Sequence, residues 1–124
     1  MTKISSDIIL FDSEGKILLQ HRTEDAPTLP GYWSIFGGGI EKGETPEEAV
    51  RRECLEELNY QLENPKLVMS QEVEAFGGTR YVFMEKYDPS KKLELLEGQG
   101  MGWFTLEETK ELKIVDHEKE VIDL

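Results

Sequence analysis

The pattern of apolar and polar residues along the chain predicts many short strands and few helices. Two apolar runs, residues 4–11 and 16–21, flank Asp12-Ser13-Glu14-Gly15, which is typical of the turn in a β-hairpin. Further strands are expected over residues 33–36, 66–76, 79–87 and 101–104, with turn-rich loops at residues 23–31 and 88–92. Because strands outnumber helices and do not alternate strictly with them, we expect an α/β (α+β) fold with a mixed β-sheet sandwiched between helices.

Two capping boxes mark the starts of helices. In Thr45-Pro46-Glu47-Glu48, a threonine N-cap precedes a proline suited to the first helical position, and a glutamate follows three residues after the cap. This segment predicts a helix over residues 46–58. Thr105-Leu106-Glu107-Glu108 predicts a second helix to about Leu112, and a last helix is expected after Asp116.

The first predicted helix gathers carboxylates on one face. At 100° per residue, Glu53, Glu56 and Glu57 fall together, whereas another face collects the apolar residues Val50, Cys54, Leu55 and Leu58. Neighbouring carboxylates repel by about 1 kcal/mol at 4 Å in water and by more in a sheltered site, so this cluster favours a bound cation. A ligand set made only of oxygen selects a hard ion, Mg²⁺ or Mn²⁺, over zinc.

The helix alone also fits a different interpretation, a solvated face with i, i+4 ion pairs such as Arg52 with Glu56. The residues before the helix argue against it. Gly37-Gly38-Gly39 is expected to begin a glycine-rich loop, and backbone without side chains can approach a ligand closely. With Glu44 in the same loop and Arg52 on the helix, this arrangement favours a binding site.

These residues also carry a family resemblance. The segment from Gly38 to Glu57 resembles the signature of the Nudix hydrolases, which cleave a nucleoside diphosphate linked to a further group. The matching pattern is Gly38, five residues, Glu44, seven residues and then Arg52-Glu53-Cys54-Leu55-Glu56-Glu57. Two positions depart from that signature: Asn59 stands at the usual glycine, and Cys54 at an aliphatic position. Asparagine tolerates left-handed backbone and can end a helix, so we expect the geometry to be kept.

The resemblance implies a role for each polar residue of the motif. The expected metal ligands are Glu53, Glu56, Glu57, a backbone carbonyl of Gly37 or Gly38, and Glu97, which would reach in from outside the motif. Arg52 and Glu44 would form an ion pair that orients the helix, and Glu53 or Glu97 would take the proton from the attacking water. The expected cofactor is Mg²⁺, with Mn²⁺ as an alternative.

A weaker likeness extends to most of the chain. The N-terminal strands and Glu97-Gly98-Gln99-Gly100, followed by Trp103-Phe104, resemble the MutT-like members, which hydrolyse nucleoside triphosphates. That group reads a purine with an asparagine near the last helix, whereas this chain has Asp116-His117-Glu118 there, so its base specificity is not expected to carry over. Aromatic residues can stack on a base, although each also suits a core. The residues expected to contact substrate are Arg22, Trp33, Gly39, Arg80, Tyr81 and His117.

Composition limits the binding partners and the cellular compartment expected for this protein. The 124 residues suit one domain, residues 1–124, and 26 acidic against 14 basic residues give a formal charge of −12. This surface disfavours stable binding to nucleic acid or to anionic membranes, and no run is apolar enough for a signal peptide or a membrane span. The single cysteine, Cys54, fits a buried position and a reducing compartment, so we expect a cytoplasmic protein.

The sequence therefore predicts a Mg²⁺-dependent hydrolase of a pyrophosphate bond, acting first of all on an ordinary or oxidised nucleoside triphosphate. ADP-ribose, dinucleoside polyphosphates and nucleotide sugars are alternative substrates, although the proline or tyrosine that marks the first two groups is missing around residues 71–78. Alternatives of another class are a non-catalytic nucleotide-binding module of the same family and a structural divalent-ion site. Many relatives are dimers, so a homodimer stays open.

Overall fold

The computed structural model describes residues 2–27, 29–73, 77–114, 118–119 and 122. Its strands are β1 (Thr2–Phe11), β2 (Ile17–His21), β3 (Trp33–Ser34), β4 (Phe36–Gly39), β5 (Lys66–Val73), β6 (Gly78–Lys86) and β7 (Gly100–Phe104). Its helices include α1 (Pro46–Leu58) and α2 (Leu106–Thr109). Within the described residues, the strands form one seven-stranded sheet.

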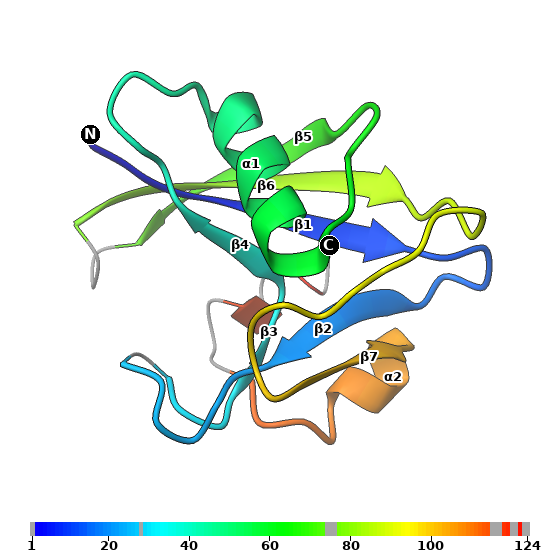
Figure 1. Ribbon diagram of the computed structural model, residues 1–124. Helices are drawn as coiled ribbons and strands as arrows, with labels where there is room; N and C mark the ends of the chain where they lie inside the picture. Colours follow the sequence, from blue (N-terminus) through cyan, green and yellow to red (C-terminus); the bar gives the residue numbers. More distant parts are fainter. Residues whose placement is uncertain (1, 28, 74–76, 115–117, 120–121, 123–124) are drawn as a thin grey trace.

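β1 is the central strand of this sheet (Figure 1). It pairs in parallel with β6 and antiparallel with β2 and β4, and β5 extends the sheet beyond β6. β2 in turn pairs antiparallel with β3 and β7. The combination of parallel and antiparallel pairs confirms the expected mixed sheet and the α/β (α+β) class.

Side chains on both faces of β1 are buried, because successive residues of a strand point to opposite faces. Ile8 and Leu10 pack towards α1, in a cluster that includes Cys54. Ile9 packs on the opposite face, in a second cluster that includes Val82. Cys54 is completely buried, as expected for a cysteine that acts as a small apolar residue of the core.

The helix α1 has the predicted bounds because local signals fix both of its ends. Thr45 Oγ1 accepts a hydrogen bond from the Glu48 N–H at 3.1 Å, and Glu48 Oε1 accepts one from the Thr45 N–H at 2.9 Å. At the other end, Asn59 adopts a left-handed conformation with φ 51°, and its N–H donates to the Leu55 carbonyl oxygen at 3.0 Å. The capping box and the asparagine cap are both confirmed.

Three details differ from expectation. The glycines expected in a loop belong to β4, where Gly37 to Gly39 pair with Asp7 to Ser5 of β1, a long-range contact that local sequence does not show. Leu55 is 48% exposed, because α1 packs through a narrow i, i+4 strip that excludes it. The second helix ends at Thr109, short of Leu112.

Two predicted segments lie partly outside the described residues. They are residues 74–76 of the predicted strand and the expected start of the last helix at Asp116. Among the helices that the structure describes, none is long and apolar enough to cross a membrane.

Candidate active site

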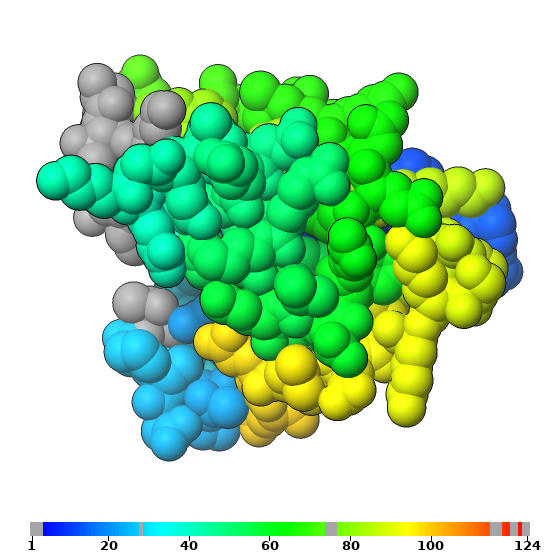
Figure 2. Space-filling model, turned by 45° about the horizontal axis from the view of Figure 1, so that its top comes forward, coloured from blue at the N-terminus to red at the C-terminus, as the bar shows by residue number. Residues whose placement is uncertain are grey.

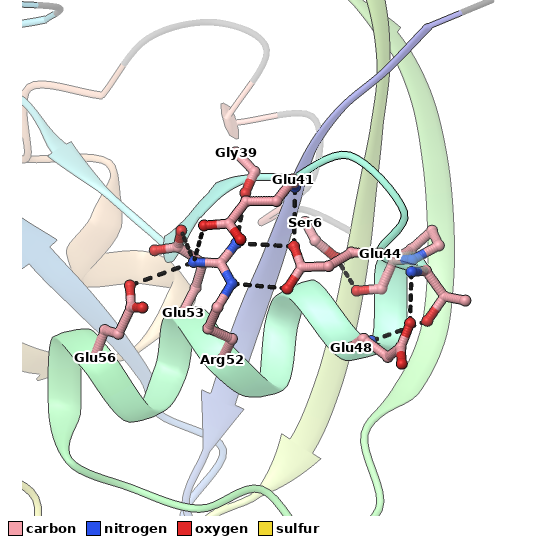
Figure 3. A network of polar contacts seen from close by, with 10 residues as sticks. Ser6, Gly39, Glu41, Glu44, Glu48, Arg52, Glu53 and Glu56 are labelled. Carbon is pink, nitrogen blue, oxygen red and sulfur yellow. Dashed lines mark hydrogen bonds and ion pairs between the residues drawn. The ribbon is translucent and has the colours of Figure 1, made fainter.

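Arg52 lies at the centre of an acidic cluster on α1 and the loop before it (Figure 3). Its Nε and Nη2 donate to the two carboxylate oxygens of Glu44 at 2.7 and 3.0 Å, so the predicted ion pair is present and bidentate. Its Nη1 donates to Glu53 at 2.9 Å and to Glu56 at 3.3 Å. The hydrogen bonds from Arg52 lower the pKa of Glu44 to about 2, so Glu44 stays ionised and holds the loop to the helix.

The glycine strand β4 lies directly against the carboxylates of α1. The Gly37 N–H donates to Glu57 Oε1 at 2.9 Å, and the Gly39 carbonyl oxygen accepts from Arg52 Nη2 at 2.9 Å. A Cβ atom added to Gly38 would collide with the Glu53 carboxylate. A side chain at this position would have to displace the Glu53 carboxylate, whereas bare backbone leaves room for it where it lies.

The connection between β6 and β7 brings Glu97 to the same place. Along it, the N–H groups of Glu94 and Leu96 donate to the carbonyl oxygens of Leu58 and Glu57 at 2.9 and 2.8 Å. These carbonyls belong to the last turn of α1 and have no partner within the helix. In Figure 2, this yellow segment borders the green and teal surface of α1. The docked segment places the Glu97 side chain in hydrogen-bonding contact with Glu57.

Two of the carboxyl groups gathered here, those of Glu57 and Glu53, resist ionisation. Glu57 is only 3% exposed, and its burial, followed by the hydrogen bond and charge of Glu97, raises its pKa to about 9. Burial also raises the pKa of Glu53, although Arg52 works in the opposite direction. A cation placed among these groups would reverse both shifts, since it favours the charged form of each carboxyl.

The donor chemistry fits a hard divalent ion, although the side chains are not arranged around one. Among the described residues, no three His, Cys, Asp or Glu side chains are poised for a metal, and the Arg52 guanidinium lies between Glu53 and Glu56. Glu53, Glu57 and Glu97 nevertheless offer only oxygen, and they lie close enough for the charges of Glu53 and Glu97 to raise the pKa of Glu57. All-oxygen ligation is the preference of Mg²⁺ and Mn²⁺.

A cavity of about 200 Å³ has the β4 glycines in its wall. Arg80 and Asp7 line it, and both point to the face that also carries Ile9 and Val82. Arg80 Nε donates to Asp7 Oδ2 at 2.7 Å. Burial outweighs this contact and raises the pKa of Asp7 to about 6.

The structure brings together some of the predicted substrate-contacting residues but not all. Arg22, Gly39 and Arg80 line the cavity. Trp33 stacks on His21 instead, with ring centroids 4.4 Å apart, and Tyr81 packs against the core under α1. His117 lies outside the described residues. The roles of all these residues in substrate binding remain predictions.

Two acidic residues of the cavity were missed by sequence reasoning. Asp7 and Glu118 are 8% and 6% exposed and line the cavity together. A signal existed for Asp7, because it is the single acid of β1 and directly precedes the apolar run Ile8 to Phe11. Glu118 has no such signal, because acidic residues surround it in the sequence and only tertiary packing distinguishes it.

A mixed sheet with a carboxylate-bearing helix behind a glycine strand defines a known class of protein, and the NUDIX domain family model matches residues 1–124. The chain belongs to this family, which confirms the resemblance inferred from the motif. Among curated relatives, the nucleoside triphosphatase NudI of Escherichia coli K12 is 49% identical over 53 residues, which are 43% of this chain and 38% of NudI. The matched part thus spans well under half the length of that relative.

Solved structures show the same fold over almost the whole chain. The MutT protein from Methanosarcina mazei Go1 has a TM-score of 0.81 and 20% identity, with 98% of this chain and 91% of that chain covered. The NUDIX domain of Shewanella oneidensis NrtR, complexed with ADP ribose, has a TM-score of 0.76 and 16% identity, with 99% and 86% covered. At these identities the likeness concerns the fold.

Proposed function

We propose that the protein is a divalent-metal-dependent hydrolase that cleaves nucleoside triphosphates to the monophosphate and pyrophosphate. The observation that carries the proposal is the convergence of Glu53, Glu57 and Glu97 against the glycine strand, where burial and mutual repulsion raise the pKa of Glu53 and Glu57. The short match to a nucleoside triphosphatase supports the substrate class.

We assign the residues of the cluster different roles in the reaction. Bound Mg²⁺ or Mn²⁺ would offset the charge of the phosphate oxygens and help to ionise water. Glu53, Glu56, Glu57 and Glu97, with a carbonyl of Gly37 or Gly38, would hold the ions, and Glu53 or Glu97 would accept the proton from the attacking water. Arg52 and Glu44 keep the helix in register with the loop, as their bidentate contact indicates.

The −12 charge of the chain agrees with a metal requirement. A triphosphate carries several negative charges and would be repelled by an acidic site in the absence of cations. Arg22 lines the cavity beside β4, where it can meet a phosphate or another polar part of the nucleotide.

A substrate panel tests this proposal. Ordinary and oxidised deoxynucleoside triphosphates, ADP-ribose, dinucleoside polyphosphates and nucleotide sugars would be ranked by kcat/KM in Mg²⁺, in Mn²⁺ and in EDTA. We expect pyrophosphate release from triphosphates, abolished by EDTA and restored by excess Mg²⁺.

Two outcomes would contradict it. Faster cleavage of ADP-ribose or a dinucleoside polyphosphate would support hydrolysis of a pyrophosphate bond but would contradict a nucleoside triphosphate as the substrate. Nucleotide binding without turnover of any compound, at any metal concentration, would identify a binding module of the same family instead.

A further inference from the structure

The carboxylate of Glu97 depends on a long connection for its position. Residues 87–99, all of which the structure describes, join β6 to β7 without forming a helix or a strand (Figure 1). The Leu96 N–H donates to the Glu57 carbonyl oxygen of α1 at 2.8 Å, so one flank of Glu97 is held. Glu97 itself is exposed, and repulsion from the other carboxylates of the cluster favours turning its side chain away. The contacts on its second flank therefore matter for its position.

The end of β2 and the residue after it hold this second flank. Gln20, which is 4% exposed, donates from Nε2 to the Glu97 carbonyl oxygen at 3.1 Å. The Gln99 N–H donates to the His21 carbonyl oxygen at 2.9 Å, and Gln99 Nε2 donates to the Arg22 carbonyl oxygen at 2.7 Å. Three consecutive residues of one segment thus bind Glu97 or Gln99.

Gly98 allows the close approach of the connection to β2. Its φ of 97° lies in the left-handed region, where a residue with a side chain is strained. A Cβ atom on Gly98 would also lie 2.9 Å from Gln20 Nε2 and 3.0 Å from the His21 carbonyl oxygen. The backbone of Gly98 is therefore packed directly against β2, so a displacement of Gln99 would be passed on to Glu97.

The side-chain amide of Gln99 is a donor with two acceptors in reach. It donates to the Arg22 carbonyl oxygen at 2.7 Å and to Glu24 Oε1 at 3.1 Å. A third contact, 3.3 Å to His21 Nε2, is the longest of the three. An amide nitrogen carries two N–H groups, whereas an ionised carboxylate only accepts hydrogen bonds. A glutamate at position 99 could therefore not make the contacts with Arg22 and Glu24.

We propose that Gln99 is a positioning residue for Glu97. By binding the Arg22 carbonyl oxygen, Gln99 fixes the connection to β2 and so keeps the Glu97 carboxylate beside that of Glu57. This inference rests on the proposed function, which assigns Glu97 to metal binding and proton transfer. Groups with such roles must be held to within about 0.5 Å of their working position, so the residues that orient them affect the reaction without touching the substrate.

A purely structural role predicts different behaviour. If Gln99 only stabilised the fold, its loss would have the same effect whether or not residue 97 is a glutamate. If Gln99 acts through Glu97, its loss has little further effect once Glu97→Gln has removed the carboxylate. The readout is therefore the non-additivity of Gln99→Ala and Glu97→Gln in a double-mutant cycle.

The first experiment measures two quantities for the wild type, both single variants and the double variant. They are kcat for a nucleoside triphosphate and, without substrate, the Kd for Mn²⁺ by EPR. We expect Gln99→Ala to lower kcat by about 10- to 100-fold and to weaken Mn²⁺ binding, as changes to residues that orient metal ligands do. In the Glu97→Gln background, both effects should shrink to less than about twofold. Equal factors in the two backgrounds would overturn the inference.

Two further variants separate the amide donors from other effects. Gln99→Glu keeps the size of the side chain but not its N–H groups, so it should be at least as harmful as Gln99→Ala. Wild-type values for Gln99→Glu would contradict a role for these donors. Gln61→Ala is the matched control, because Gln61 is an exposed glutamine in the segment after α1, and it should leave kcat and the Kd for Mn²⁺ unchanged.

A second measurement covers the case in which Gln99→Ala does not fold. Hydrogen exchange of the Gln99 backbone N–H, which donates to His21, would be followed with and without Mg²⁺ in the wild type and in Glu97→Gln. Because coupling between binding and position is reciprocal, Mg²⁺ should slow this exchange in the wild type and not in Glu97→Gln. The same response in both proteins would contradict the link between Gln99 and Glu97.

The two proposals can fail separately. If the wild type hydrolyses triphosphates while the losses from Gln99→Ala and Glu97→Gln multiply, the proposed function stands and the positioning role of Gln99 falls. If no compound is hydrolysed but Gln99→Ala weakens Mn²⁺ binding only when Glu97 is present, Gln99 positions a metal ligand without the proposed reaction.

Discussion

Two arginines of this protein are surrounded by carboxylates, yet they belong to different kinds of cluster. Arg52 pairs with Glu44, eight residues away, and its side chain is 23% exposed. Arg80 pairs with Asp7 and Glu118, which are 73 and 38 residues away, and its side chain is 5% exposed. The first cluster is built by a helix and its preceding loop, and the second by the topology of the sheet.

The comparison shows how exposure to water changes the contribution of an ion pair to stability. Ion pairs that water reaches contribute little to stability. The charges of the Arg52 cluster can therefore be changed, or can act on a ligand, with little effect on the fold. A buried pair becomes costly when one partner is removed, because the other charge is left without compensation. We therefore expect changes in the Arg52 cluster to affect activity and changes in the Arg80 cluster to affect stability.

The largest effect is expected at Glu53. Glu53→Gln removes a proposed metal ligand and proton acceptor, so kcat/KM should fall by about 10²- to 10⁴-fold. The melting temperature should stay the same or rise, because burial already disfavours the charged form of Glu53. Glu47→Gln is the matched control, since Glu47 lies on the same helix with its side chain 55% exposed. Retention of more than about a tenth of the activity would disprove the role of Glu53.

The next largest effect concerns stability. Arg80→Met should lower the free energy of unfolding by about 3–5 kcal/mol, because it leaves two carboxylates buried without their partner. Arg52→Met should lower it much less, since water reaches the Arg52 cluster. Urea denaturation of both variants measures the difference. Equal losses would show that burial does not separate the two clusters.

A pH dependence is expected from Glu57. Its pKa is raised from an ordinary 4.5 to about 9, so the stability that this group contributes is complete below pH 4.5 and is lost as the pH rises towards 9. Between pH 7 and 9, above the Asp7 pKa of about 6, the metal-free protein should become less stable, and Mg²⁺ should restore it at the upper end. Glu57→Gln should flatten the profile in EDTA. Identical profiles for the variant and the wild type would assign the pH dependence to another group.

The smallest effect tests the helix that carries the Arg52 cluster. Asn59 closes α1 with φ 51°, a conformation that costs most residues about 1–2 kcal/mol. Asn59→Ala should lower the free energy of unfolding by about 1 kcal/mol, whereas Asn59→Gly should leave it unchanged or slightly raised. Thermal denaturation of the pair is the measurement, and a larger loss with glycine than with alanine would contradict the cap assignment.

Local signals explain which parts of the fold could be predicted. The bounds of α1 follow from Thr45, Pro46 and Asn59, each of which acts within one turn of the helix. The strand character of Gly37 to Gly39 could not be predicted, because it depends on pairing with β1, about thirty residues earlier in the sequence. A helical wheel also could not show that Leu55 faces solvent while Glu57 is buried, since this depends on what packs against α1.

The same limit applies to the site. The Glu44–Arg52 ion pair was predictable because its members lie in one continuous motif. The cavity was not, because Asp7, Arg80 and Glu118 meet only after β1 and β6 pair in parallel and the C-terminal part folds over them. Sequence reasoning thus found the residues of the motif more readily than the way in which distant residues meet in the cavity.

Cys54 has a practical consequence for studying this protein in solution. It is the single cysteine, it is completely buried, and burial followed by the charges of Glu57 and Glu85 raises the pKa of its thiol to about 12. Reagents that modify cysteine attack the thiolate, so the native thiol should stay silent at neutral pH. A cysteine introduced at Leu67, which is 55% exposed on β5, would then accept a fluorophore or spin label selectively in the otherwise natural chain.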